Sequence, residues 1–315
     1  MQAYRYHATG PDARPELEDV PPPPLGAGEL LVRVRYASLN PVDWKIASGK
    51  FNFLVKGGTP RTMGSDFSGE VAALGPGVSG WAPGDPVMGF VDPFKRSAGT
   101  FAEFVPVPVG FLMRRPAGVD DVLGAALPCV GITAVGMCDL TRVGRGSSAL
   151  VNGASGGVGH LAVQVAKARG ALVAATASAG RRDFVTGLGA DVFIDYRAEP
   201  VDRWPMAFDA VLDCVPNLPR GSHRRLLKRG GHYASTLPSA WTYTVDPLLN
   251  RVGRVRRHAL MLQPNERATS ELLDYCVSGR LRCEIAGQFP LDEAAEAVRL
   301  SREGRVAGKL VIRVA

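Results

Sequence analysis

A cluster of glycines in the middle of the chain is the feature with the clearest chemical meaning. It lies between a short apolar segment, residues 148–152, and a stretch from residue 161 that has one apolar face. A strand, a glycine-rich turn and a helix in this order bring backbone N–H groups and the positive end of a helix dipole to one point, which is how proteins hold a dinucleotide pyrophosphate. The predicted site consists of Gly153, Ser155, Gly156, Gly157, Val158 and Gly159.

The glycine spacing by itself is a weak signal. Ala154, Gly156 and Gly159 give A-x-G-x-x-G, in which the first glycine of the usual fingerprint is replaced, and such spacings often arise by chance. A tight turn without a ligand is the alternative. The context favours a binding site, because a second apolar segment, residues 171–178, follows and completes a βαβ unit of the required length.

The end of that second segment bears on which nucleotide is bound. NAD sites present Asp or Glu there to the ribose 2′-hydroxyl, and this chain has neither. Ser178, Arg181 and Arg182 instead offer donors suited to a 2′-phosphate, so we predict NADPH. Adjacent helical residues point about 100° apart, so we expect one arginine to reach the phosphate; the alternative is a solvated helix face. Tyr196, after the next strand, is placed to cover the adenine or touch the same phosphate.

Composition favours a two-domain enzyme. The 315 residues are about twice a typical domain, and 46% are hydrophobic. No signal core or stretch of about 18 to 20 apolar residues occurs, so we expect a cytoplasmic location. Five cysteines without a C-x-x-C pair fit reduced thiols.

The net charge of +7 comes from basic residues that are scattered along the chain and are densest in residues 220–229 and 251–257. Without a recognition motif it indicates a solvated face, and we expect no nucleic-acid partner and no membrane.

The chain has two regions with different sequence patterns. Up to residue 121, short alternating segments separated by Pro- and Gly-rich turns predict a β-barrel. From 122 to 262, strands and helices alternate, which predicts a parallel sheet with crossover helices. The predicted barrel strands are residues 29–38, 68–74, 86–91 and 100–106; the elements of the second region are 148–152, 161–169, 171–178, 181–188, 192–195, 210–214, 224–229, 231–235 and 256–262. Cys214 and Ser235, the last residues of two of these strands, are also assigned to the cofactor site. Residues 263–315 are assigned back to the first domain.

Six motifs follow one another in a family-specific order. They are Ala-Ser-Leu-Asn-Pro-Val-Asp-Trp-Lys (37–45), Gly-Ser-Asp-Phe-Ser-Gly-Glu-Val (64–71), Gly-Ile-Thr-Ala (131–134), Gly-Ala-Ser-Gly-Gly-Val-Gly (153–159), Leu-Gly-Ala-Asp-Val-Phe-Ile-Asp-Tyr (188–196) and Gly-Lys-Leu-Val (308–311). The whole chain thereby resembles a zinc-independent medium-chain dehydrogenase/reductase of the quinone oxidoreductase branch. The resemblance implies an α/β protein: a GroES-like β-barrel catalytic domain (1–121 and 263–315), a Rossmann doubly wound parallel-sheet domain (122–262) and an active site in the cleft between them. It also implies a homodimer formed along the strand 256–262.

The same resemblance argues against a metal. Alcohol dehydrogenases of the family place Cys, His and Cys around a catalytic zinc, and the corresponding positions here are Asn40, Asp66 and Cys129. One thiolate and one carboxylate do not make a three-ligand N/S site. The first 120 residues contain no cysteine and a single histidine, His7. We therefore expect no metal.

A reductase without a metal needs a donor to the carbonyl oxygen on which charge develops, and a proton source. Such chemistry suits quinones and α,β-unsaturated carbonyl compounds, with enoyl thioesters as a third possibility. By resemblance Asn40 lies near nicotinamide and substrate, and Thr133 contacts the nicotinamide end. The alternatives are an Asx turn before Pro41 and an ordinary helical threonine.

The proton donor is an open point. Many relatives carry a tyrosine where this chain has Phe51, which donates no proton. Tyr36, Lys45 and Lys50 are the candidates, and each is otherwise a barrel residue or a solvated charge. Asp43 is a candidate to orient Lys45 or form a salt bridge. Failing these, water protonates the product, or the chain is a nucleotide-binding protein with little redox activity and a structural, regulatory or pathway-assembly role.

Overall fold

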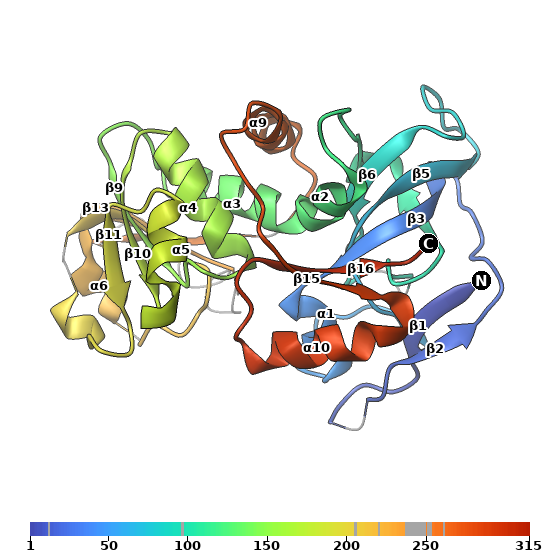
Figure 1. The fold of residues 1–315 in the computed structure, drawn as a ribbon, viewed down its shortest axis with the longest axis horizontal. Helices are drawn as coiled ribbons and strands as arrows, with labels where there is room; N and C mark the ends of the chain where they lie inside the picture. Colours follow the sequence, from blue (N-terminus) through green and yellow to red (C-terminus); the bar gives the residue numbers. More distant parts are fainter. Residues whose placement is uncertain are drawn as a thin grey trace. The chain divides into compact units, whose positions relative to one another are not determined.

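Strands from both ends of the chain build one of two compact units. In the computed structural model, which describes residues 1–315 apart from 12, 96–97, 205–206, 220, 237–249, 251–253 and 261, unit 1 is Met1–Cys129 with Ile285–Ala315, and unit 2 is Val130–Glu284 (Figure 1). Among the described residues, no helix is both long and apolar enough to cross a membrane. Each unit has its own sheet, so each is described by itself.

Unit 1 is dominated by a mostly antiparallel sheet. Its strands are β3 (Glu29–Leu39), β5 (Asp66–Leu74), β6 (Pro86–Phe90), β7 (Phe104–Pro108), β8 (Leu112–Arg114), β15 (Ile285–Pro290) and β16 (Lys309–Arg313). The order is β15-β16-β3-β5-β6-β8, with β7 paired to β3. A smaller sheet has the order β2-β1-β4, with β1 (Gln2–Tyr6), β2 (Glu16–Asp19) and β4 (Arg61–Thr62). Residues at alternate positions of β3, including Leu30, Val32 and Val34, are fully buried in the core that the strands enclose.

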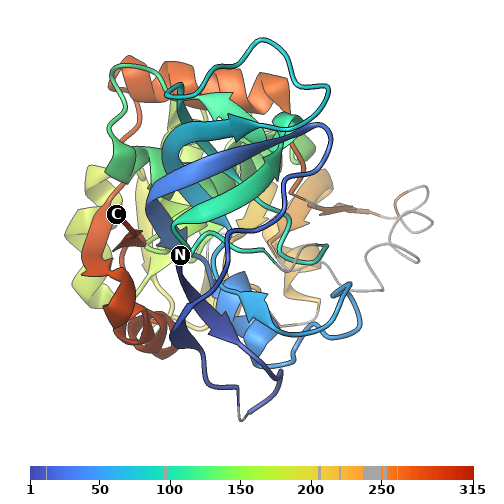
Figure 2. The same cartoon turned by 90° about the vertical axis from the view of Figure 1, so that its right-hand side faces the viewer.

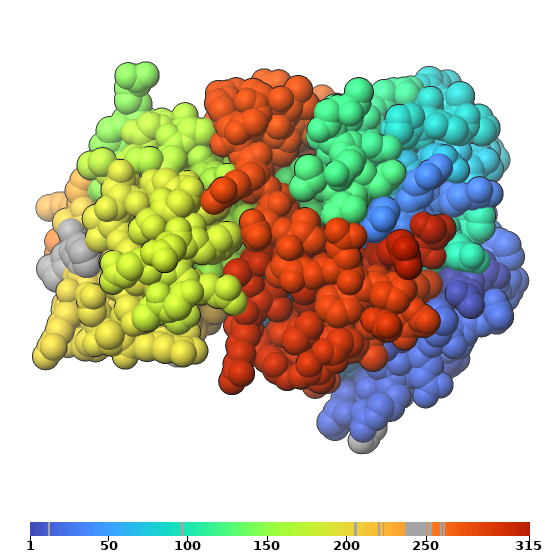
Figure 3. Space-filling model, in the orientation of Figure 1, coloured from blue at the N-terminus to red at the C-terminus, as the bar shows by residue number. Residues whose placement is uncertain are grey.

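The C-terminal segment completes unit 1. Helices α1 (Pro41–Ala47), α2 (Asp121–Ala126) and α10 (Ala294–Glu303) accompany the strands. Leu310 of β16 lies opposite Leu39 of β3 in an antiparallel pair, and the two chain termini lie near each other (Figure 2). In the space-filling view the residues after 285, orange to red, lie beside N-terminal residues in blue (Figure 3). The last strand therefore brings its first residue, Lys309, to the end of β3.

Unit 2 is built on a six-stranded parallel sheet. Its order is β11-β10-β9-β12-β13-β14, with β9 (Ser148–Asn152), β10 (Leu172–Ala177), β11 (Val192–Asp195), β12 (Phe208–Asp213), β13 (Leu227–Ser235) and β14 (Arg256–Ala259). The helices are α3 (Pro128–Leu140), which begins at the end of unit 1, α4 (Gly157–Ala168), α5 (Arg182–Gly187), α6 (Ser222–Leu226) and α9 (Glu266–Val277). The strand order reverses direction between β9 and β12. Such a switch point is where open α/β sheets bind ligands, outside the carboxyl ends of the strands.

Several predicted boundaries differ from the structure. The units divide after residues 129 and 284, not after 121 and 262, because α2 packs against β3 and β5 and α9 is tied to α4 by the Arg169–Glu271 ion pair. The fourth predicted barrel strand, residues 100–106, begins at Phe104 in the structure. Residues 227–229, predicted as part of the segment 224–229, belong to β13. Of the basic segments, residues 220 and 251–253 lie outside the described residues, as does residue 261 of the last predicted strand.

Candidate nucleotide site and a buried polar cluster

The turn between β9 and α4 has the backbone form that a phosphate site requires. Gly153 has φ +77°, and a Cβ there would lie 2.4 Å from Cγ2 of Val215, so glycine is needed. A Cβ at Gly159 would lie 2.1 Å from the Gly153 carbonyl oxygen, so the helix packs directly onto the turn. At Gly156, the N-cap of α4, the nearest atom to an added Cβ is 3.5 Å away. A side chain could thus be added at the start of α4 without a clash, and the first N–H groups of a helix are the ones that have no partner within the helix.

A network of buried side chains fixes this turn. Thr176 Oγ1 accepts from the Gly153 N–H at 3.0 Å and donates to Asn152 Oδ1 at 2.7 Å. Asn152 Nδ2 donates to Asp213 Oδ1 at 2.7 Å, and the Tyr233 hydroxyl donates to Asp213 Oδ2 at 2.6 Å. These groups lie at or near the carboxyl ends of β9, β10, β12 and β13. The network joins the turn to four adjacent strands.

Sequence reasoning did not assign these network residues. The available signal was that Asn152 and Asp213 are polar residues at the ends of apolar strands. Burial raises the pKa of Asp213 to about 6, while the hydrogen bonds from Tyr233 and Asn152 oppose the shift. The carboxyl group is therefore ionised at neutral pH, where both its oxygens accept hydrogen bonds.

The residues predicted to select NADPH gather at the carboxyl ends of β10 and β11. Ser178 follows β10, and Arg181 ends the short 3-10 helix Ala179–Arg181. Arg182 opens α5, and its guanidinium lies 4.4 Å from the centroid of the Phe193 ring. Tyr196 follows β11 with 43% of its surface exposed, and its backbone N–H donates to the Ala177 carbonyl at 3.3 Å.

Three further predicted cofactor residues lie on other elements of unit 2. Cys214 follows β12 and is half-buried, and its Sγ donates to the Leu212 carbonyl at 3.8 Å. Ser235 ends β13 as the register partner of Asp213. Thr133 is buried on α3. Cys214 and Ser235 therefore lie at the carboxyl ends of the strands, as the glycine turn does.

Unit 1 contains a separate buried polar cluster at the end of β3. Asn40 Nδ2 donates to Asp66 Oδ2 at 2.7 Å and to Ser65 Oγ at 3.1 Å. Asp66 also accepts from Ser38 Oγ at 3.1 Å and, through Oδ1, from the Cys129 backbone N–H at 2.8 Å. That N–H belongs to the first turn of α3, where helices carry a partial positive charge. The three positions that correspond to metal ligands, Asn40, Asp66 and Cys129, therefore lie together.

A lysine far away in the sequence enters the same cluster. Lys309 Nζ donates to Asn40 Oδ1 at 2.7 Å and to the Leu39 carbonyl at 3.1 Å, and it lies 3.4 Å from Asp66 Oδ2. The residue is only 3% exposed. Sequence reasoning included it in the motif of residues 308–311 but gave it no role. Its long-range contact with Asn40 explains why.

Asp43 connects the cluster to the start of α1. Its Oδ2 accepts from the Asn40 backbone N–H at 2.8 Å, and its Oδ1 accepts from Ser65 Oγ at 2.9 Å. Burial raises its pKa to about 7. The expectation that Asp43 orients Lys45 is replaced by this arrangement, because residues two apart on a helix do not face each other. Asp43 instead caps the helix that follows Asn40.

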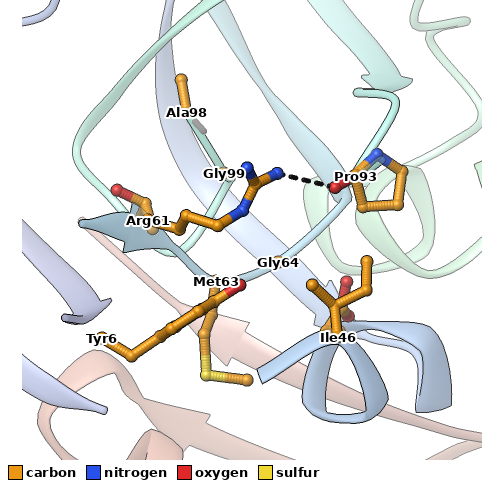
Figure 4. Close-up of a pocket in the computed structure, with 10 residues that line it drawn as sticks. Tyr6, Ile46, Arg61, Met63, Gly64, Pro93, Ala98 and Gly99 are labelled. Atoms are coloured by element: carbon orange, nitrogen blue, oxygen red, sulfur yellow. Dashed lines mark hydrogen bonds between the residues drawn. The ribbon is translucent and has the colours of Figure 1, made fainter. Parts of the chain in front are cut away.

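A small pocket borders Asp43 on the side of Tyr6 and Arg61 (Figure 4). Arg61 donates to the Pro93 carbonyl at 2.8 Å, and both residues line the pocket. The volume is about 20 Å³, which suffices for about one water molecule. Ligand pockets are about 300 to 1,000 Å³. This pocket is too small for a quinone ring.

The other candidate proton donors are not among the cluster residues just described. Tyr36 is half-buried on β3, where it pairs with β5 and β16. Lys45 is half-buried on α1 with Nζ 5.4 Å from the centroid of the Trp44 ring, and burial lowers its pKa. Lys50 is exposed, and Phe51 is buried. Of the predicted catalytic residues, the structure places Asn40 in the cluster.

Known proteins share both units. Residues 26–117 match the family model for the alcohol dehydrogenase GroES-like domain, and residues 188–312 match that for zinc-binding dehydrogenase. A chloroplast envelope quinone oxidoreductase homolog of Arabidopsis thaliana is 31% identical, with 99% of this chain and 98% of that protein covered. The chain belongs to the medium-chain dehydrogenase/reductase superfamily, in its quinone oxidoreductase branch. The predicted GroES-like and Rossmann fold class is confirmed.

Two further relatives add detail to this membership. The structure of the quinone oxidoreductase from Coxiella burnetii has a TM-score of 0.92 and 33% identity, covering 100% of this chain and 99% of that chain. An NADPH-dependent alkenal/one oxidoreductase from the chloroplast of Arabidopsis thaliana is 30% identical, covering 92% of this chain and 73% of that protein.

The name of one matching family model implies zinc, and the residues present do not fit it. Asn40 supplies an amide oxygen that already accepts from Lys309. Burial and the adjacent Asp66 carboxylate raise the pKa of the Cys129 thiol well above its usual value, whereas zinc binds the thiolate. Within the described ranges, no group of three or more His, Cys, Asp or Glu side chains is arranged to hold a metal ion.

Proposed function

We propose that this member of the quinone oxidoreductase branch uses NADPH to reduce a quinone or an α,β-unsaturated carbonyl compound, without a metal. The glycine turn at the switch point of the parallel sheet carries the proposal. The names of relatives that act on quinones and on alkenals or alkenones support the substrate class. Bound NADPH would supply a hydride to the electron-poor carbon of the substrate.

The nucleotide would be held by the elements around the turn. We assign the N–H groups of Gly157 and Val158 to the pyrophosphate, because they open a helix and because the nearest atom to an added Cβ at Gly156 is 3.5 Å away. Arg181 and Arg182 are our candidates for the 2′-phosphate, and the Arg182 guanidinium lies over the Phe193 ring. Tyr196 remains the candidate to cover the adenine or touch that phosphate. The proposed site further includes Cys214 and Ser235.

Asn40 remains our candidate for the contact with the substrate oxygen, under one condition. Both N–H bonds of its amide are directed to protein acceptors, Ser65 and Asp66. To donate to a substrate, the amide must release one of them. Protonation of the reduced product then falls to Tyr36, Lys45 or water, because Phe51 has no proton to give.

The engaged Asn40 amide and Phe51 also favour a second candidate function. A protein with this nucleotide site and no available donor would bind NADPH and turn over little substrate. Its role would then be structural, regulatory or in the assembly of a pathway. The two functions differ in turnover and agree in nucleotide binding.

The deciding experiment measures both properties on the same preparation. NADPH oxidation is followed at saturating nucleotide with 1,4-benzoquinone, 2-cyclohexenone and an enoyl thioester as acceptors. NADPH-induced thermal stabilisation is measured in parallel. Turnover that saturates with one acceptor supports the reductase and identifies its substrate class. Stabilisation without turnover of any acceptor supports the second function, and absence of both refutes the nucleotide site.

A further inference from the structure

Lys309 is a buried cation whose partners account for its three hydrogens. The ammonium donates to Asn40 Oδ1 and the Leu39 carbonyl, and its third neighbour is Asp66 Oδ2 at 3.4 Å. Burial of a charge is costly unless the charge is paired and hydrogen-bonded. Here both conditions are met inside one cluster.

The lysine also decides how Asn40 is oriented. An ammonium group only donates, and an ionised carboxylate only accepts. Asn40 lies between Lys309 and Asp66, so its oxygen must face the lysine and its nitrogen the carboxylate. The second N–H then donates to Ser65 Oγ, whose hydroxyl in turn donates a hydrogen bond to Asp43. The orientation of the Asn40 amide thus follows from Lys309 on one side and Asp66 on the other.

We propose that the Lys309 ammonium takes the place of a catalytic metal in this chain and is the positioning residue for Asn40. Nζ lies 2.7 Å from Asn40 and 3.4 Å from Asp66, two of the three positions that correspond to metal ligands. A divalent cation needs ligand atoms at about 2.0 to 2.3 Å, so it has no room beside the ammonium, whose charge also repels it. The positive charge is thus built into the fold by the last strand.

The first test builds a metal site with and without the lysine. Asn40→Cys with Asp66→His would give, with Cys129, a set of two cysteines and one histidine, which is a known zinc-ligand combination. We compare this double variant with the triple variant that also carries Lys309→Met, using Co²⁺ as the probe because thiolate ligation gives a charge-transfer band. Circular dichroism and a cooperative thermal melt establish that each variant is folded.

The expected result is a difference in metal affinity. The triple variant should bind one equivalent of Co²⁺, and the variant that keeps Lys309 should bind it at least about a hundredfold more weakly, since ligands and ammonium compete for one position. Equal affinity would refute the proposal, because the lysine would then not occupy the metal position. Failure of both folded variants to bind Co²⁺ would refute it as well.

Single substitutions give an independent second test. Lys309→Met keeps an unbranched apolar side chain, one atom shorter, and removes the charge and the donor, so Asn40 loses its fixed orientation. We expect kcat to fall roughly tenfold or more, as for the loss of a charge-assisted hydrogen bond, with the Kd for NADPH within about twofold. Lys309→Arg should recover part of kcat. A fall in melting temperature with unchanged kcat would show a structural role only.

The kinetic test rests on the proposed reductase function, whereas the cobalt test does not. If the wild type turns over no acceptor, the kinetic test cannot be run and the reductase proposal fails. The cobalt comparison would still decide whether Lys309 occupies the metal position. The two failures are therefore distinguishable.

Discussion

Replacement of Gly156 by alanine separates nucleotide binding from folding. An added Cβ at this N-cap residue would lie 3.5 Å from the Gly153 carbonyl oxygen, an ordinary contact, and its φ of −79° and ψ of 176° suit any residue. The cost to folding is therefore that of an alanine N-cap, about 1 kcal/mol or less. The methyl group would fill the space proposed for the pyrophosphate. Loss of one charge-assisted hydrogen bond there, about 1.5 to 3 kcal/mol, corresponds to roughly a ten- to hundredfold weaker Kd for NADPH.

The matched substitution Gly159→Ala should act on the fold instead. Its Cβ would lie 2.1 Å from the Gly153 carbonyl oxygen and 2.8 Å from the Ala154 Cα, and backbone atoms cannot yield as a flexible side chain can. Overpacking of this kind costs about 1 to 3 kcal/mol or more. For a domain of this size, each kcal/mol lowers the melting temperature by about 2 to 4 °C. The same chemical change, three residues apart, thus affects nucleotide binding at one position and folding at the other.

Isothermal titration with NADPH and thermal melts without nucleotide measure the two effects. We expect Gly156→Ala to melt within a few degrees of the wild type and to bind NADPH at least about tenfold more weakly. Gly159→Ala should melt several degrees lower. Unchanged NADPH affinity in a folded Gly156→Ala variant would refute the placement of the pyrophosphate at this turn.

Four further predictions concern other parts of the molecule. Arg181→Ala combined with Arg182→Ala should weaken NADPH binding about ten- to a hundredfold and leave NADH nearly unchanged, because only NADPH carries the 2′-phosphate; equal loss for both nucleotides in fluorescence titrations would contradict this. Activity should survive dialysis against a strong chelator, and recovery of lost activity on adding zinc would count against a metal-free site. Light scattering at micromolar concentration should give twice the 33.4 kDa of the chain, with β14 at the outer edge of the described sheet; a monomer mass would exclude the dimer. Burial raises the pKa of Asp213 to about 6 from an unfolded value near 4, so its contribution to the stability of the folded protein is lost as pH rises from about 4 to 6. The unfolding free energy of the wild type, measured relative to Asp213→Asn in urea titrations, should therefore fall over that window. A difference that does not depend on pH would refute the shift.

The βαβ unit around the glycine turn could be predicted from the sequence because its signals are local. The strands β9 and β11 begin and end at the predicted residues, 148–152 and 192–195, since each is a short apolar run bounded by polar or turn residues. The glycine turn and the residues after β10 follow from the same pattern. Their role toward a nucleotide stays a prediction.

The position of α9 shows what a local sequence pattern leaves undetermined, namely the domain against which a helix packs. Residues 263–315 are all expected in the first domain, whereas the structure has a helix from Glu266 to Val277 in unit 2. The pattern gives the buried face and does not say which domain covers it. Arg169 decides this, because its guanidinium binds Glu271 through Nε and an NH2 nitrogen, each at 2.9 Å. A pair separated by 102 residues leaves no periodic signal in one sequence.

The polar cluster was beyond sequence reasoning for a related reason. Asn40 and Asp66 were identified through their motif positions, but their partners were not. Lys309 reaches Asn40 across 269 residues, and its contact depends on the register of β16 against β3. A single lysine at the start of an apolar strand reads as a solvated charge. The register of the strand pair places it inside.

The bonding of this cluster argues that a metal site and the present site cannot be exchanged by one substitution. Asn40→Cys alone would leave the Lys309 ammonium without its 2.7 Å acceptor, and Lys309→Met alone would leave Asp66 buried without a cation. Breaking the buried Lys309–Asp66 ion pair costs about 3 to 5 kcal/mol, and leaving a buried donor without its acceptor costs about 1 to 3 kcal/mol, against a typical stability of about 5 to 15 kcal/mol. Each single step therefore passes through a destabilised protein that still lacks a full ligand set. While the Lys309 ammonium is buried in this cluster, no single substitution of its neighbours therefore gives a metal site.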